Sequence, residues 1–234
     1  METKISNPTQ EYYAQRLKQI HDIGNINAYP NKFVVTKRIP EFISEFNYLQ
    51  NDETSTTEVN IAGRIMNISK VSSKLYFYVI HSDGMHIQIF AQFQYWTGTR
   101  EEWNAIHKQI NRGDIIGVTG KPTRTRTGEL SIAPLSMKLL STCFHMLPRE
   151  HTGLVDKEVR FRQRYLDLML NTSVRNTFKT RSRIISFIRQ FLDARDFLEV
   201  ETPMMNTVPG GATARPFITH HNELNMDLYM RVAP

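Results

Sequence analysis

The sequence predicts an α+β protein in which helices precede a small five-stranded β-barrel and the opening part of a mixed-sheet domain follows it. Two observations lead to this fold class. Short strand-like segments with one intervening helix fill the middle of the chain, and a long amphipathic helix followed by a short strand comes after them. We therefore divide the chain into residues 1–58 (helices and linker), 59–142 (barrel), 143–160 (connector) and 161–234 (partial second domain).

Length and composition exclude several other classes of protein. The 234 residues are 40% hydrophobic, which excludes a fully disordered chain, and 11 Gly with 10 Pro exclude a collagen-like one. We expect no membrane span, because no run of about 18 apolar residues occurs, and no secretory signal in the polar opening segment. The single cysteine, Cys143, favours a reducing compartment. The net charge, 29 − 23 = +6, permits a polyanionic partner without identifying one.

Two helices are expected before the barrel. The first covers residues 9–23 and is followed by Gly24, a typical helix stop. The second covers residues 40–49 and has Pro40 in its first turn, where proline is tolerated. The polar residues 51–58 have no periodicity and predict an exposed linker. The apolar residues at helical spacing in the first helix are Tyr13, Leu17 and Ile20.

The barrel is predicted from five strands. Gly63 marks a bend in the first, and Ser82-Asp83-Gly84 is a turn that makes the second and third a hairpin. A helix over residues 100–112, ending at Gly113, separates the third strand from the fourth. This order is typical of the oligonucleotide/oligosaccharide-binding barrel, the OB-fold. The predicted strands are residues 59–68, 75–80, 87–90, 115–118 and 130–140.

The second part of the chain is mainly helical. A helix is expected over residues 161–170 and a long one over residues 173–194, and strands over residues 197–201 and 225–232 flank the loop 206–216. One face of the long helix is apolar and the other is basic. The apolar positions are Val174, Phe178, Ile185, Ile188 and Leu192, and the basic ones are Arg175, Lys179, Arg183 and Arg189.

The barrel strands carry a candidate site for an unstacked base. Alternation places Leu75 and Phe77 on one face, and Gln88 lies on the paired strand. An exposed ring can stack on a base while an amide reads the base edge. From the pattern alone, a core position for Phe77 is the stronger alternative. Lys121, Arg124 and Arg126 surround the last hairpin, where they contact phosphate or simply face solvent.

Three segments in order resemble one enzyme family. They are Arg162-Gln-Arg-Tyr-Leu-Asp-Leu168, Phe197-Leu-Glu-Val-Glu-Thr-Pro-Met-Met205 and Pro209-Gly-Gly-Ala-Thr-Ala-Arg-Pro-Phe-Ile-Thr-His-His-Asn222. The long helix, short strand and Pro203 resemble motif 1 of class II aminoacyl-tRNA synthetases. Together with the barrel, the segments resemble lysyl-tRNA synthetase over nearly the whole chain.

The resemblance implies an ATP-dependent ligase that forms lysyl-adenylate and transfers lysine to tRNA(Lys). It implies a cytoplasmic homodimer, joined through the helix around Val174–Ala194, which uses ATP and Mg²⁺. Residues implied to recognise the anticodon are Arg64, Phe77, Gln88 and Glu129. Residues implied to border the lysine pocket are Gly210, Gly211 and Ala212, although an ordinary Pro-Gly-Gly turn is the alternative.

The catalytic residues of the family are expected beyond Pro234. Neither the arginine of motif 2 nor that of motif 3 occurs in these residues, so we expect the 234-residue chain alone to be inactive. The family has glycine where this chain has Asp196, which tolerates the same left-handed conformation better than most residues. Two alternatives remain: an anticodon-binding fragment without ligase activity, and an aspartyl- or asparaginyl-type synthetase.

No metal site held by protein ligands is expected. His220 and His221 are neighbours on an extended segment, so their side chains point to opposite faces and do not readily share one ion. Glu199 and Glu201 alternate with apolar residues and are better read as polar strand positions than as an acid–base pair.

Overall fold

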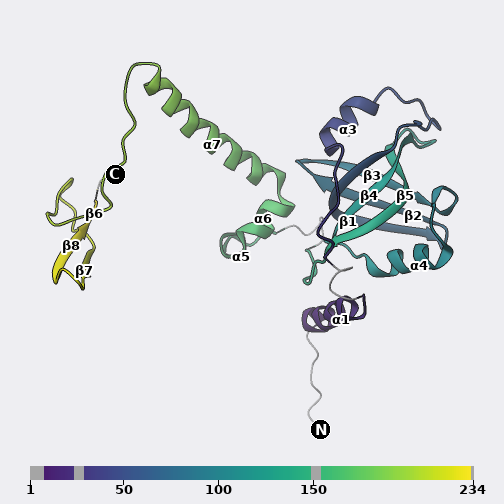
Figure 1. The fold of residues 1–234 in the computed structure, drawn as a ribbon, viewed down its shortest axis with the longest axis horizontal. Coiled ribbons are helices and arrows are strands. Elements are labelled where there is room, and N and C mark those ends of the chain that lie inside the picture. The colour runs from purple at the N-terminus through teal and green to yellow at the C-terminus, as the bar shows by residue number, and fades with distance from the viewer. Residues whose placement is uncertain (1–7, 24–28, 149–153, 233–234) are drawn as a thin grey trace, which may run out of the picture. The chain divides into compact units, whose positions relative to one another are not determined.

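The computed structural model describes residues 8–23, 29–148 and 154–232, which form two compact units, Met1–Phe161 and Arg162–Pro234. We describe each unit by itself. The predicted helix stop at Gly24 lies outside the described residues. Figure 1 shows the first unit as a barrel with accompanying helices, and the second as helices and a small sheet.

The first unit is the closed five-stranded barrel that the sequence predicts. Its strand order is β1-β2-β3-β5-β4, in which β3 and β5 are parallel and every other pair is antiparallel. Helix α4 (Arg100–Gln109) separates β3 from β4 and ends before the predicted residue 112. The strands are β1 (Val59–Ser72), β2 (Leu75–Ser82), β3 (Met85–Gln92), β4 (Ile115–Arg124) and β5 (Leu130–Ser141).

Local backbone chemistry sets the register of β1 to β3. Asp83 and Gly84 both have positive φ, 54° and 85°, as a two-residue hairpin turn with the favoured twist requires. The irregularities of β1 against β2 fall between Ile65 and Asn67 and between Lys70 and Ser72, not at Gly63. A Cβ on Gly63 would lie 3.1 Å from the carbonyl oxygen of His81, so this glycine allows close strand approach.

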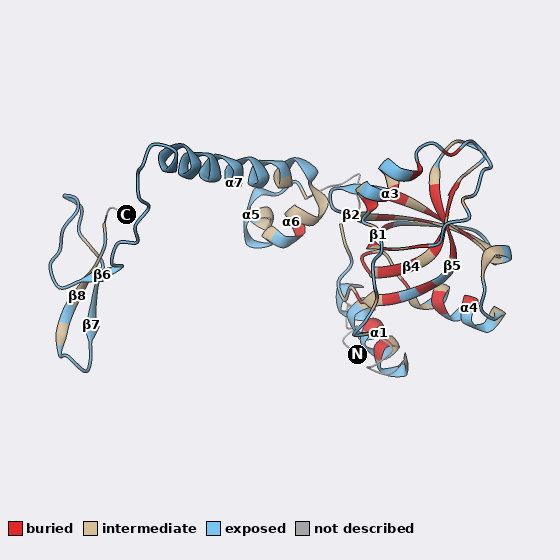
Figure 2. Cartoon of the chain, turned by 45° about the horizontal axis from the view of Figure 1, so that its top comes forward, coloured by how far each residue is buried: buried red, intermediate tan, exposed pale blue. Residues whose placement is uncertain are grey.

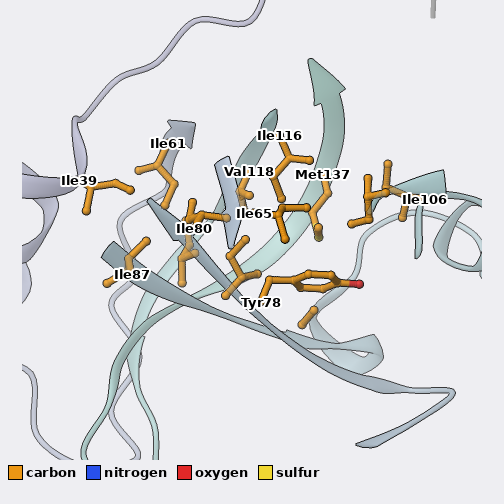
Figure 3. Close-up of a cluster of buried hydrophobic side chains, with 14 of the residues drawn as sticks. Ile39, Ile61, Ile65, Tyr78, Ile80, Ile87, Ile106, Ile116, Val118 and Met137 are labelled. Carbon is orange, nitrogen blue, oxygen red and sulfur yellow. The ribbon is translucent and has the colours of Figure 1, made fainter. Parts of the chain in front are cut away.

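Aliphatic side chains from all five strands fill the barrel (Figure 3). Helix α3 (Ile39–Phe46) adds Ile39, Phe42 and Phe46 to this core, and α4 adds Trp103 and Ile106. The two helices cover different ends of the barrel (Figure 1). The N-terminus of α4 is capped by Thr99, whose hydroxyl accepts from the amide of Glu102 at 3.2 Å.

The segment 51–58 is more ordered than the predicted linker. Thr54 forms a β-bridge with Thr123, and the amide of Asp52 donates to the carbonyl of Arg124 at 3.0 Å. Most of these side chains are exposed, as predicted, while the backbone pairing was not predicted. The backbone pairs with the edge of β4, which satisfies polar groups that a free edge would leave open.

A buried ion pair attaches the first helix, α1 (Pro8–Ile23), to the barrel. The guanidinium of Arg16 donates to both carboxylate oxygens of Asp114, at 2.7 and 2.6 Å. The side chains are 2% and 0% exposed. Asp114 also accepts from the amides of Asn111 and Cys143, both at 2.7 Å. These bonds satisfy the buried carboxylate, which lowers the cost of removing its charge from water.

Helix α4 meets the barrel through a stack of aromatic rings. His107 lies parallel to Tyr76, with ring centroids 4.2 Å apart, and its Nδ1 hydrogen-bonds to the hydroxyl of Tyr78. Burial lowers the pKa of His107 to about 4, and the cations Arg100 and Lys70 add to this effect. The imidazole is therefore neutral at pH 7, and its hydrogen bond with Tyr78 joins two uncharged groups.

The chain after the connector differs from its prediction in detail. In place of one helix over 161–170, α5 (Lys157–Arg162) and α6 (Arg164–Leu170) are separated at Gln163. The long helix α7 (Thr172–Asp193) is confirmed, and Asp196 after it has φ of 61°, the left-handed conformation expected there.

The strand predicted over residues 197–201 is wrong. These residues are exposed and belong to no β-sheet, although the side chain of Glu199 accepts a hydrogen bond from Arg189 at 3.0 Å. Further along, β6 (Met205–Asn206) and β7 (Ile218–His221) flank β8 (Met226–Met230) in a three-stranded sheet. Only β8 was predicted, with wider bounds. Strands β6 and β7 are too short for an alternation of apolar and polar residues to be recognised in the sequence.

Buried residues are concentrated in the first unit (Figure 2). In α7 no residue is buried among those described, and its apolar face is open: Ile185 is 43% exposed and Ile188 is 50% exposed. Within the described residues, no helix has both the length and the apolar character to cross a membrane.

We predict that Asp114→Asn lowers the free energy of unfolding by about 3–5 kcal/mol, because the Arg16 charge would remain buried without its partner. Urea unfolding at pH 7 measures the change. The control is Glu41→Gln, which breaks the solvent-exposed pair with Arg38 and should change the free energy of unfolding far less, because water screens an exposed pair. Equal effects of the two substitutions would contradict the anchoring role of the buried pair.

We also predict a histidine contribution to acid sensitivity. The folded-state pKa of His107, about 4, lies below its ordinary value of 6.5, so the unfolded chain binds the proton first. Stability from this group is complete above about pH 6.5 and declines as the pH falls toward 4. The double variant Tyr78→Phe/His107→Phe keeps the rings and removes both polar groups. Its unfolding midpoint should change less than wild type between pH 7 and 4.5; parallel pH profiles would refute the assignment.

Candidate nucleic-acid groove

An open groove of about 470 Å³ lies on the barrel. It is bounded by strand residues of β1, β2 and β3, by the β4–β5 loop, and by the segment that precedes the barrel. The lining residues are Asp52, Ser69, Phe77, Gln88, Phe90, Thr125, Arg126 and Thr127. The groove therefore brings together two of the predicted residues, Phe77 and Gln88, from neighbouring strands.

Two aromatic rings form its apolar surface. Phe77 on β2 is paired with Phe90 on β3, and their ring centroids are 5.4 Å apart at an interplanar angle of 22°. Tyr95 meets the edge of Phe90 at 6.3 Å. Phe77 is only half-buried, so the alternative that it belongs to the core is wrong. A partly exposed pair of rings can accept the face of an unstacked base.

An amide lies beside these rings. Gln88 is in register with Val79 on β2 and with Ser131 on β5. The hydroxyl of Ser131 donates to Oε1 of Gln88 at 2.9 Å. Because Ser131 is fully buried, this bond has no competition from bulk water. The groove thus offers a held polar group next to an apolar platform.

Arg124 connects the segment that precedes the barrel to the β4–β5 loop, beside the groove. Its Nε donates to the carbonyl of Leu49 at 2.6 Å, one terminal nitrogen to the carbonyl of Asn47 at 2.8 Å, and the other to that of Gly128 at 2.8 Å. The guanidinium therefore holds segment 47–49 against the β4–β5 loop. From the sequence, Arg124 was expected either to contact phosphate or to face solvent. Its guanidinium instead donates to backbone carbonyls within the protein.

The structure does not bring the other two predicted anticodon residues into the lining of this groove. Arg64 lies in the middle of β1, before the lining residue Ser69, and donates to the carbonyl of Gly113 at 2.7 Å. Glu129 is exposed at the end of the β4–β5 loop, and its backbone amide donates to the hydroxyl of Thr125 at 3.0 Å. Their roles in binding stay predictions.

The predicted lysine-pocket residues lie in an exposed loop of the second unit. Gly211 has φ of 101°, which favours glycine, and a Cβ on Gly210 would meet no atom within 4 Å. Ala212 is exposed as well. The described residues do not enclose a ligand around this loop, so its role also stays a prediction.

The described residues contain no group of three or more His, Cys, Asp or Glu that could hold a metal ion. His220 pairs with Asp227 at 2.9 Å, while Nδ1 of His221 accepts from the amide of Leu224 at 3.2 Å. The two histidines thus have separate partners.

Comparison with known families defines the class of protein. Residues 59–140 match the model of the OB-fold nucleic acid binding domain, and residues 156–234 match that of the class II tRNA synthetases for D, K and N. An OB-fold followed by the start of a class II catalytic domain agrees with the fold class predicted from the sequence.

The particular family follows from individual relatives. The chain is 46% identical to a lysine–tRNA ligase of Cladosporium cladosporioides over 230 residues, covering 96% of this chain and 38% of that protein. It is 40% identical to a protein of Encephalitozoon cuniculi named as a probable cytoplasmic lysine–tRNA ligase, covering 100% and 45%. For a lysine–tRNA ligase of Dichelobacter nodosus the identity is 43%, covering 94% and 44%. The chain belongs to the lysyl-tRNA synthetase family and spans less than half the length of these relatives.

Sequence reasoning did not point to several lining residues of the groove, among them Phe90 and Asp52. Phe90 was available from alternation, since it lies two residues after Gln88 and shares its side of β3. Asp52 gave no such signal, because a polar linker has no period. Its left-handed conformation, φ 62°, and its pairing with Arg124 appear only in three dimensions.

Proposed function

We propose that the protein of which these residues form part is a lysine–tRNA ligase, and that the barrel groove binds the anticodon of tRNA(Lys). The observation that carries the proposal is the placement of Phe77, Phe90 and Gln88 in one open groove. Family membership supports the activity, since the relatives are named lysine–tRNA ligases. ATP and lysine are the other proposed substrates.

The groove suits a single-stranded RNA loop in three ways. The paired rings of Phe77 and Phe90 offer stacking without regard to base identity. The amide of Gln88 can distinguish base edges through directional hydrogen bonds. Arg126 in the β4–β5 loop is exposed and lines the groove, where its charge can meet a phosphate. A double-stranded ligand would hide the base faces that this arrangement offers.

The family model that matches residues 156–234 describes the D and N synthetases as well as the K type, so it does not by itself separate the aspartyl and asparaginyl types from the lysyl type. The relatives reported above favour the lysyl type. The proposed site residues Arg64 and Glu129, and the lysine-pocket loop Gly210–Ala212, rest on the family resemblance. A cytoplasmic location is proposed from the name of the Encephalitozoon relative.

We predict that Phe77→Ala weakens binding of a lysine-tRNA anticodon stem–loop by about 1–3 kcal/mol, the usual value of stacking one base on an aromatic ring. Fluorescence anisotropy at fixed salt measures the affinity. The matched control is Val71→Ala, an exposed apolar residue on β1 outside the groove, which should leave the affinity unchanged. Unchanged affinity in Phe77→Ala would reject the anticodon groove, and equal affinity for aspartate and lysine stem–loops would reject the lysyl assignment.

We propose further that α7 forms a homodimer contact through its apolar face. Seven apolar side chains of this helix are at least 40% exposed, and such a face is rare on a monomer. These residues are Phe178, Ile184, Ile185, Phe187, Ile188, Phe191 and Leu192.

Ile188→Glu should shift the chain toward a monomer, because Ile188 lies on the apolar face and a carboxylate there would be desolvated in the interface. Sedimentation velocity at several concentrations measures the shift. Lys179→Glu is the control on the predicted basic face. A monomer at every concentration in the wild type would contradict the dimer.

The 234 residues alone are proposed to be inactive in lysine activation. The arginines of motifs 2 and 3, which contact ATP in the family, are not among them. We predict no lysine-dependent exchange of pyrophosphate into ATP above background, measured next to an intact lysine–tRNA ligase as positive control. Exchange by the purified 234-residue chain would overturn this prediction while leaving the anticodon groove intact.

A further inference from the structure

We propose that Ser131 is a positioning residue that fixes the orientation of the Gln88 amide, so that the groove presents a hydrogen-bond donor to the base. This rests on the proposed function, because it concerns how the same groove selects its ligand. Gln88 by itself is ambiguous: rotating its amide by half a turn exchanges a carbonyl acceptor for an NH₂ donor at the same place.

The fold places Ser131 where it can remove this ambiguity. It sits near the start of β5, and its Cα is in register with that of Gln88 across the parallel β3–β5 pair. Its hydroxyl lies 2.9 Å from Oε1 of Gln88. The side chain is fully buried, so its proton must find a partner inside the protein.

Only one other acceptor competes for that proton among the described contacts of Ser131. The carbonyl of Glu129 lies 3.2 Å from the hydroxyl. That carbonyl already accepts the backbone amide of Thr125 at 2.9 Å, within the β4–β5 loop. The Gln88 oxygen is nearer and has no other hydrogen-bond donor among the described residues. The shorter distance and the occupied Glu129 carbonyl favour Oε1 of Gln88 as the acceptor of the Ser131 proton.

The polarity of the groove follows from this bond. With Oε1 held by Ser131, the polar group that Gln88 offers to a ligand is the Nε2 amide, which only donates. A base with a keto oxygen at the reading position, uracil O4 or guanine O6, accepts from it. A base with an amino group there, cytosine N4 or adenine N6, sets a donor against a donor. Ser131 thus acts through Gln88 to select keto bases.

The test compares stem–loops in which uracil is exchanged for cytosine at each anticodon position in turn. In wild type, one position should show a preference for uracil of about tenfold or more, as one well-made hydrogen bond provides. Ser131→Ala should reduce that preference to within about threefold, because the amide can then rotate. Ser131→Thr keeps the hydroxyl and should retain it. Thermal unfolding confirms that each variant is folded.

A second variant is expected to reverse the base preference instead of abolishing it. Gln88→Glu keeps an oxygen for Ser131 and replaces the donor with an acceptor, so the preference at that position should turn toward cytosine. An equal loss of affinity for all stem–loops in Ser131→Ala, with the uracil preference intact, would overturn the positioning role. An unchanged preference in Gln88→Glu would do the same.

If Phe77→Ala binds as tightly as wild type, the anticodon groove itself is wrong. If Phe77→Ala loses affinity while Ser131→Ala keeps full discrimination, the groove stands and only the role of Ser131 is overturned.

Discussion

The buried carboxylate of Asp114 is the interaction on which the arrangement of the first unit depends. It lies between helix α4 and strand β4 and binds the guanidinium of Arg16, the amide of Asn111 and the amide of Cys143. Its own backbone carbonyl accepts from Ile65 in β1 at 2.8 Å. One residue thus connects the first helix, two strands and the start of the connector. Because a desolvated charge tolerates few geometries, these segments share one fixed arrangement.

Arg112, two residues earlier, extends the same junction. Its guanidinium donates to the carbonyls of Met66, Leu147 and Pro148 at 2.6–2.8 Å. The chain therefore leaves the barrel along a defined path as far as Pro148. Gly113 between the two charged residues has φ of 99°, and a Cβ there would come within 2.8 Å of Sγ of Cys143. Glycine is needed for this close approach.

The sequence predicted the barrel well because its signals are local. The Asp83-Gly84 turn, the helix capped at Thr99 and the alternation within each strand are all readable from neighbouring residues. Alternation also placed Phe77 and Gln88 close together. The order of segment 51–58 could not be read, since it depends on pairing with β4, more than sixty residues away. The strand expected at 197–201 failed for a related reason: alternation gives a strand its faces, but a strand also needs a hydrogen-bonding neighbour.

Charge illustrates the difference between composition and position. The net charge of +6 is compatible with an RNA partner, yet several arginines that contribute to it are occupied within the protein. Arg16 is buried against Asp114, and Arg112 and Arg124 donate to backbone carbonyls. These side chains build the barrel and its groove instead of meeting phosphate. The total number of cations therefore says little about nucleic-acid binding. The position of Arg126, in the groove that Phe77, Phe90 and Gln88 also line, supports it more strongly.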